Sequence, residues 1–206
     1  MKFVLFVEGH TENKAVPEFL GRCLNSRLSE RIGVKTVRYN GWADLLKDLP
    51  KRAEMYLNDP TQPDIVAVIA LLDLYLPDPN EREVFEKRRE HAVERLRDWV
   101  DLNRFRLFLA IHEVEAWLLS SPNLFPDPVR KNLESSVKAP EDVNFDKPPS
   151  KLLEQLYVNN RKKGYKKVTD GSALFRKLDP EIVYSRCPRF REMVDEMVAL
   201  AQAAGL

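Results

Sequence analysis

The most apolar stretch of the sequence reads Ile65-Val66-Ala67-Val68-Ile69-Ala70-Leu71-Leu72-Asp73. Its first eight residues are all apolar, whereas a strand with one face in water alternates apolar and polar side chains. A continuous apolar run of this length is typical of a strand that is buried on both faces of a parallel sheet. Asp73 ends the run and a proline-punctuated loop, residues 74–80, follows it. This stretch therefore predicts the central strand of the fold.

Strand-like and helix-like segments alternate on both sides of the central strand. Further strands are predicted at residues 2–7, 34–39 and 105–111, and helices with apolar residues at helical spacing at 12–28, 42–57, 81–100 and from 112. Such alternation is typical of parallel strands joined by right-handed crossovers. The sequence therefore predicts an α/β, Rossmann-like fold with a mostly parallel four-stranded sheet flanked by helices.

The length and the prolines predict how the chain is organised. A chain of 206 residues suits one substantial core with an appendage. Six prolines between residues 121 and 149 predict a long loop, and helices are expected from Ser150 onward, near 172–178 and 189–203. We expect an α/β domain at residues 1–120 and, at 121–206, a proline-rich loop and C-terminal helical extension packed on it as one unit.

Charge and cysteine content narrow the class of protein. The 33 Lys and Arg residues nearly balance the 32 Asp and Glu, for a formal charge of +1, so any polyanion must be bound locally. Cys23 and Cys187 lie far apart and suggest neither a disulfide framework nor a zinc site. The apolar N-terminal run is too short for a signal peptide, and no segment is expected to span a membrane. A cytoplasmic protein is predicted.

Acidic residues follow three of the predicted strands. Glu8, Asp73 and Glu115 come after apolar runs, and ligands of parallel sheets bind outside the carboxyl ends of the strands. Clustered carboxylates repel one another unless a cation lies between them, and oxygen ligands suit Mg²⁺, with Mn²⁺ as a substitute. Glu113 is a further candidate ligand. If residues 113–115 are extended, Glu113 and Glu115 share a face and both can reach the site, whereas on a helix only one of them can. Glu8 is the candidate for a ligand that also moves a proton.

Basic residues of the second half supply candidate phosphate contacts. The run 161–167 contains Lys163, Lys166 and Lys167 around Tyr165, a composition typical of nucleic-acid backbone contacts and also common in surface loops. Lys151 is predicted at the start of a helix, where a cation is unfavourable unless it faces an anion. We therefore expect Lys151 to bind phosphate and to stabilise transition-state charge.

The order of these motifs resembles a known superfamily. Glu8-Gly9-His10-Thr11-Glu12 after the first strand and Asp73 after the third resemble the TOPRIM motifs of topoisomerases, primases and old-family nucleases. The resemblance implies that Glu12 is also a metal ligand. One departure is Tyr75, which stands where most TOPRIM domains have a second acid, and Asp78, Glu113 or Glu115 are the candidate substitutes.

A narrower resemblance covers nearly the whole chain. The motifs that carry it are Phe6-Val7-Glu8-Gly9, Asp73-Leu74-Tyr75-Leu76-Pro77, His112-Glu113-Val114-Glu115-Ala116, Pro149-Ser150-Lys151, Tyr165-Lys166-Lys167 and Cys187-Pro188-Arg189-Phe190. Together they resemble a bacterial TOPRIM-like family, the domain of unknown function 4276. The resemblance implies an ATPase partner and a role in defence against foreign DNA.

Three functions are compatible with these patterns. The leading hypothesis is a Mg²⁺-dependent nuclease that acts on nucleic acid, with DNA as the expected substrate. The alternative is a non-catalytic module that keeps the TOPRIM scaffold and binds an ATPase or nucleic acid. A nucleotide-binding domain fits less well, because the first turn lacks the G-x-G-x-x-G pattern.

Overall fold

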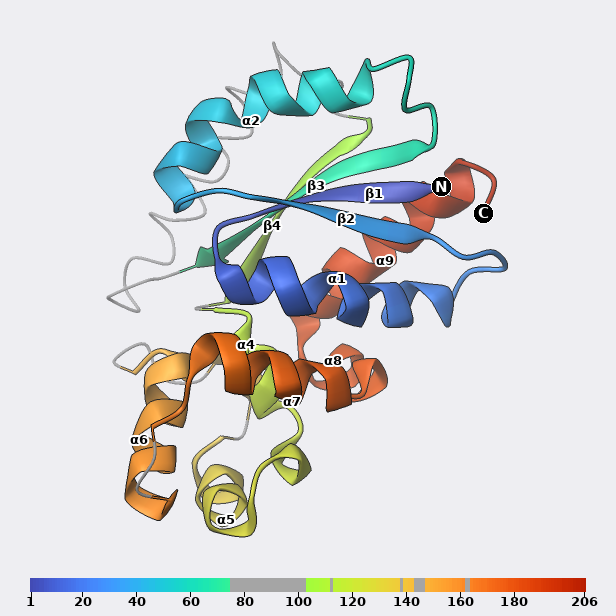
Figure 1. Cartoon of the computed structure of the whole chain (residues 1–206). Helices are drawn as coiled ribbons and strands as arrows, with labels where there is room; N and C mark the ends of the chain where they lie inside the picture. The colour runs from blue at the N-terminus through green and yellow to red at the C-terminus, as the bar shows by residue number, and fades with distance from the viewer. Residues whose placement is uncertain (75–102, 112, 138, 143–146, 162–163) are drawn as a thin grey trace.

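The computed structural model describes residues 1–74, 103–111, 113–137, 139–142, 147–161 and 164–206 (Figure 1). Its centre is a sheet of four parallel strands in the order β2-β1-β3-β4. The strands are β1 (Lys2–Val7), β2 (Gly33–Arg38), β3 (Ile65–Leu74) and β4 (Phe105–Ile111). The predicted fold class is confirmed. The helix predicted at 81–100 lies outside the described residues.

The strand register brings the carboxyl ends of neighbouring strands together. Val7 at the end of β1 pairs with Arg38 of β2 on one side and with Leu71 of β3 on the other. Asp73 of β3 pairs in turn with Ala110 of β4. The residues that follow β1 and those at the end of β3 therefore lie side by side at one edge of the sheet.

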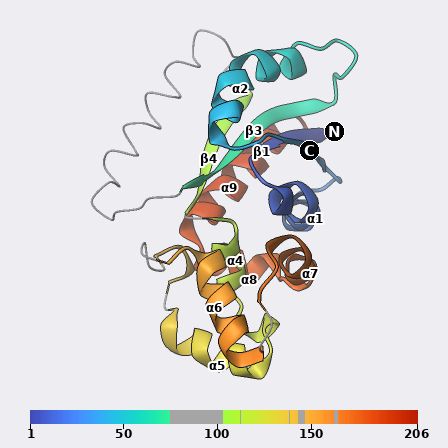
Figure 2. The same ribbon diagram turned by 60° about the vertical axis from the view of Figure 1, so that its left-hand side comes forward.

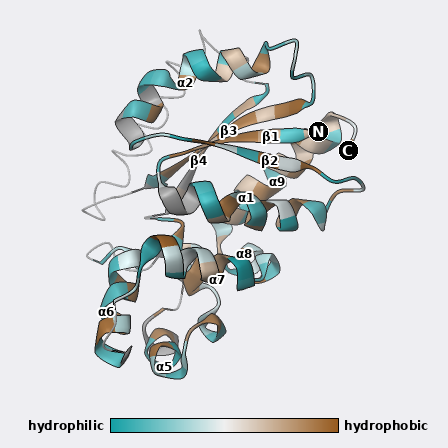
Figure 3. Cartoon of the chain, viewed as in Figure 1, coloured by the Kyte–Doolittle hydropathy of each residue, from teal (hydrophilic) through white to brown (hydrophobic). Residues whose placement is uncertain are grey.

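Helices cover both faces of the sheet (Figures 1 and 2). On one face lie α1 (His10–Asn25) and α9 (Pro188–Ala203), and on the other lies α2 (Trp42–Leu57). Each face has its own hydrophobic cluster, one with Phe3, Phe19 and Met197 and the other with Phe6 and Leu49. Figure 3 shows β3 as mostly hydrophobic, the edge strand β2 as mixed, and the outer surface of α2 as largely hydrophilic. Both faces are covered, so β1 and β3 are apolar at successive positions.

The region 121–149 is more helical than predicted. It contains η2 (Pro122–Leu124), α5 (Asp127–Ser136) and η3 (Pro140–Asp142), so the prediction of a long loop there is wrong. The physical reason is that a proline in the first turn of a helix loses no hydrogen bond and has a φ suited to the helix. Pro122, Pro128 and Pro140 occupy such first turns, and Pro149 begins the next helix, α6 (Pro149–Arg161).

The remaining helices pack against the sheet domain. They are α4 (Glu115–Leu119), η4 (Lys167–Gly171), α7 (Ser172–Lys177) and α8 (Pro180–Arg186), the last of which was not predicted from the sequence. Trp117 of α4 stacks edge-on against Phe190 of α9 with ring centroids 4.8 Å apart, and Phe190 also packs against Phe19 of α1. Within the described residues, no helix is both long and apolar enough to cross a membrane.

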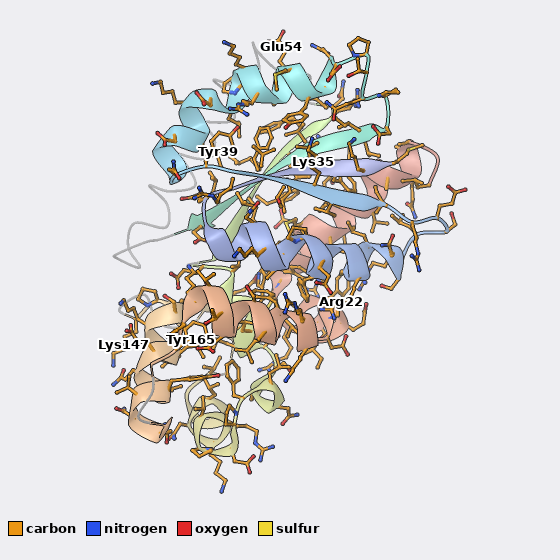
Figure 4. The ribbon with its side chains drawn as sticks, in the orientation of Figure 1. Arg22, Lys35, Tyr39, Glu54, Lys147 and Tyr165 are labelled. Carbon is orange, nitrogen blue, oxygen red and sulfur yellow. The ribbon has the colours of Figure 1, made fainter. Side chains whose placement is uncertain are left out.

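One side chain links α1 to the end of α7. The Arg22 guanidinium donates hydrogen bonds to the carbonyl oxygens of Phe175, Arg176 and Leu178 at 2.8, 2.7 and 3.0 Å (Figure 4). The last carbonyls of a helix have no partner within the helix, so a cation at this position satisfies them and opposes the negative end of the helix dipole.

Candidate metal and nucleic-acid site

The connections of the sheet define a switch point between β1 and β3. From β1 the chain passes through α1 on one face to β2, and from β2 it returns through α2 on the other face to β3. In open parallel sheets, the crevice at which the connections change direction is the usual ligand site. Glu8 directly follows β1, and Asp73 lies next to the last residue of β3. The two acids therefore flank the switch point.

Glu8 and Asp73 are in direct contact. The backbone N–H of Asp73 donates a hydrogen bond of 3.1 Å to Oε1 of Glu8. Both residues are half-buried at the carboxyl edge of the sheet. The hydrogen bond holds the Glu8 carboxylate over the end of β3.

Glu113 and Glu115, which follow β4, are joined by a lysine from a distant part of the chain. The ammonium of Lys167, the first residue of η4, lies 3.3 Å from Oε1 of Glu113 and 3.2 Å from Oε2 of Glu115. Glu115 is fully buried, whereas the Lys167 side chain is 36% exposed. The ammonium therefore supplies a positive charge between two acids that would otherwise repel each other.

Glu113 also caps a helix. Its carboxylate accepts the backbone N–H of Ser150 at 2.9 Å and the Ser150 hydroxyl at 3.0 Å, in the first turn of α6. A carboxylate in this position satisfies orphan N–H groups and is favoured by the positive end of the helix dipole. The sequence marks Ser150 as the start of a helix, but it does not identify Glu113 as the side chain that binds the Ser150 N–H and hydroxyl.

The other predicted phosphate-binding residues are spread around this region. Lys151 is 69% exposed and pairs with Glu154 on the same helix at 3.0 Å. Lys166 is exposed, and Lys163 lies outside the described residues. Figure 4 labels Tyr165, which is buried and packs edge-on against Tyr157 with ring centroids 5.6 Å apart. Burial raises the pKa of the Tyr165 phenol well above its usual range, so the phenol stays neutral.

The acids at the switch point suit a hard divalent cation. Mg²⁺ is usually held by one or two carboxylates, with water and substrate phosphate completing its octahedron, and Glu8 and Asp73 provide such a pair. Among the described residues, no three His, Cys, Asp or Glu side chains converge as a ready-made ligand shell. Glu12 lies in the first turn of α1, but its side chain is outside the described part of the structure, as are Tyr75 and Asp78.

The fold and these acids define the class of protein. A parallel sheet of order β2-β1-β3-β4 with Glu8 after β1 and Asp73 at the end of β3 is the TOPRIM-like arrangement that the sequence predicts. The model of one family, described as "Domain of unknown function (DUF4276)", matches residues 7–198. The chain therefore belongs to this family.

Solved structures with a similar chain path were also found. The C-terminal region of the Burkholderia pseudomallei OLD protein is 18% identical, with a TM-score of 0.48 over 95% of this chain and 98% of the other. The C-terminal region of the Xanthomonas campestris pv. campestris OLD protein is 14% identical, with a TM-score of 0.46 over 99% of this chain and 97% of the other. The search of curated proteins found no match.

Proposed function

We propose that the protein is a Mg²⁺-dependent nuclease of the TOPRIM-like class that cleaves nucleic-acid phosphodiester bonds, with DNA as the expected substrate and Mn²⁺ as a substitute metal. One observation carries the proposal. Glu8 and Asp73 meet at the switch point of a parallel sheet, where a 3.1 Å hydrogen bond fixes the Glu8 carboxylate beside the end of β3. A carboxylate held beside a second acidic residue at a ligand-binding edge suits a hard cation and a phosphate.

Each acid has a proposed role. Glu8 and Asp73 hold the cation, and Glu12, in the first turn of α1, adds a further carboxylate. When bound, the cation lowers the pKa of an attacking water and neutralises charge on the phosphate. Glu8 accepts or returns the proton of that water. Glu115 and Glu113 are proposed as ligands at the neighbouring end of β4.

Lys167 links these acids to the phosphate. Its ammonium pairs with both Glu113 and Glu115, and its side chain is still one third exposed. A cation in this position attracts a substrate phosphate toward the acids and offsets charge that develops on it during cleavage. Lys151, Lys163 and Lys166 belong to the same proposed nucleic-acid surface, whereas Tyr165 is buried against Tyr157 and cannot contact the nucleic acid as the sequence suggested. Of these, the described lysines Lys151 and Lys166 are exposed.

The biological setting is also a proposal. The motifs that resemble the TOPRIM-like family support an ATPase as partner and a role in defence against foreign DNA. The two widely separated cysteines, which suit a reducing compartment, support a cytoplasmic location.

The test is cleavage of plasmid and single-stranded DNA with Mg²⁺ or Mn²⁺ by wild-type protein and by the Glu8→Ala, Asp73→Ala double variant. The expected result is cleavage that needs the metal and is abolished in the double variant. A matched control is the Glu54→Gln, Asp64→Asn double variant, which removes two exposed acids from α2 and from just before β3. Cleavage that survives in the Glu8 and Asp73 variant refutes the assignment.

A non-catalytic binding module is the second candidate. The observation that favours it is that the Lys167 ammonium already pairs with both Glu113 and Glu115 and offsets one of their two negative charges, so these acids have less need of a metal ion. This candidate predicts identical melting curves with and without Mg²⁺. A metal-binding site instead predicts a stabilisation of RT ln(1 + [L]/Kd), which disappears in the Glu8 and Asp73 variant.

A further inference from the structure

A cavity of about 310 Å³ lies between the end of the edge strand β2 and the flank of α2. Three cationic side chains line it, namely Arg38 from β2 and Lys47 and Arg52 from α2. Asp44 and Asp48 of α2 also line it, so cations outnumber acids by three to two. The volume lies at the lower end of the range for small-ligand sites, about 300 to 1,000 Å³.

The cavity is next to the proposed catalytic acids. Arg38 pairs with Val7, the residue before Glu8, and the backbone N–H of Tyr39 donates to the Val7 carbonyl at 2.9 Å. Neighbouring strands lie about 4.8 Å apart, so the end of β2 is one strand spacing from Glu8 and roughly 10 Å from Asp73. The cavity and the acids therefore share the carboxyl edge of the sheet.

The cations of the cavity are available to an anion. Lys47 and Arg52 are exposed, and among the described residues neither forms an ion pair. The helix that carries them begins next to the cavity after Gly41, whose φ of 95° is suited to glycine, and no side chain caps that helix end. Asp44 in the first turn of α2 also lines the cavity and offsets the positive end of the helix dipole, so the attraction for an anion comes from the three cationic side chains.

Tyr39 provides a second, independent feature of the cavity. It lines the cavity, is 7% exposed, and lies between β2 and α2 (Figure 4). Its buried hydroxyl has no hydrogen-bond partner among the described residues. Burial raises the pKa of this phenol to about 12, so it remains a donor at neutral pH. The hydroxyl is shielded from solvent and the ring packs on Phe6 at 5.5 Å between centroids, so Tyr39 forms the wall of the cavity and makes no contact with a ligand through its hydroxyl.

We propose that this cavity binds one nucleotide that flanks the bond to be cleaved, with its phosphate held by Arg38, Lys47 and Arg52. The inference rests on the proposed nuclease function, because only a nuclease site at Glu8 and Asp73 places the cavity on the path of the substrate DNA. The phosphate of this nucleotide lies at the end of β2, one β-strand spacing away from the phosphate at Glu8. Asp44 and Asp48 accept hydrogen bonds from the exocyclic amino group of the base of the same nucleotide, which orients it.

The test measures binding of a fluorescent single-stranded oligodeoxynucleotide by fluorescence anisotropy. EDTA is present so that cleavage does not interfere. The Arg38→Gln, Lys47→Gln, Arg52→Gln variant is expected to bind at least about tenfold more weakly, the effect of removing one charge-assisted hydrogen bond. The slope of log K against log salt becomes shallower by about 0.7 for each phosphate of a single strand that the variant no longer neutralises. Far-UV circular dichroism checks that the variant is folded.

The matched control removes the same charge elsewhere. The Lys131→Gln, Lys177→Gln, Arg191→Gln variant alters three exposed cations on α5, α7 and α9 and is expected to bind as the wild type does. Equal affinity and equal salt slope in the cavity and control variants overturn the cavity assignment.

Parallel cleavage assays separate the two proposals. A wild type that cleaves, together with a cavity variant that binds normally, refutes the cavity and leaves the nuclease intact. A wild type that binds through the cavity but never cleaves supports the cavity and refutes the nuclease. A wild type that binds no nucleic acid refutes both.

Discussion

The Lys167 ammonium lies between two acids, and the Lys167→Met variant removes its charge while keeping most of its length. In the wild type, the ammonium is 3.2 Å from Glu115, which is fully buried, and 3.3 Å from Glu113. In the variant both carboxylates are without this cation, and Glu115 cannot reach bulk water. We expect Lys167→Met to lower the free energy of unfolding substantially.

The size of the destabilisation follows from the geometry. At about 3.2 Å and an effective dielectric constant of about 20, each pair has a Coulomb energy of roughly 5 kcal/mol, most of which desolvation offsets. Breaking a buried pair from one side costs about 3 to 5 kcal/mol. The Lys167 side chain is 36% exposed, so solvent screens the pair. We therefore expect the free energy of unfolding to fall by about 3 kcal/mol, the lower end of this range. For a protein of this size, that change lowers Tm by roughly 6 to 12 °C.

Urea and thermal unfolding followed by circular dichroism measure this effect. The matched control is Lys151→Met, because Lys151 forms an ion pair of similar length, 3.0 Å, but is 69% exposed and its partner Glu154 is 50% exposed. An exposed pair contributes less than about 1 kcal/mol, so the control should change stability by about 0.5 kcal/mol. Adding Glu115→Gln to Lys167→Met should restore part of the stability. Equal destabilisation in the Lys167 and Lys151 variants would refute the reasoning.

Three further predictions concern stability. Glu141→Gln weakens two charge-assisted bonds from the first backbone N–H groups of α9, at 2.8 and 3.1 Å, and should cost about 1 to 2 kcal/mol in urea unfolding. Unchanged stability would show that the α9 start does not depend on that charge. Arg22→Leu removes three bonds to α7 carbonyls and should cost about 2 kcal/mol, with Arg22→Lys intermediate, and an unchanged urea midpoint in both variants would contradict this. Burial raises the pKa of the Cys23 thiol from its ordinary 9.0 to about 11, so the folded state favours the protonated thiol. The Cys23 thiol therefore makes its full contribution to the free energy of unfolding below pH 9, and this contribution is lost as the pH rises to about 11. This part of the pH dependence should be absent in Cys23→Ala.

The local patterns of the sequence predict the sheet well, because each strand and helix has its own signal. The helix at 42–57 was predicted at its observed bounds, and the three strands of the first half are within two residues of theirs. Prolines misled the prediction between 121 and 149. A proline is compatible with both a loop and the first turn of a helix, and only packing against neighbouring elements distinguishes the two.

The candidate site was predictable only where it depends on the sheet. Acids after β1 and at the end of β3 meet because parallel strands end at one edge, so Glu8 and Asp73 follow from the strand pattern. The partners of Glu113 and Glu115 do not follow from it. A chain with 33 basic and 32 acidic residues offers many ion pairs, and none of them is selected by sequence spacing alone.

The sequence by itself determined the alternation of strands and helices and the acids at the strand ends, because both depend on local periodicity and on the rules of parallel sheets. Only the tertiary structure decided that Lys167 lies between Glu113 and Glu115, that Glu113 caps α6, and that β2 and α2 enclose a cationic cavity. Most of these contacts join segments tens of residues apart. Their formation depends on how the helices dock on the sheet, which is set by the shape of the whole core.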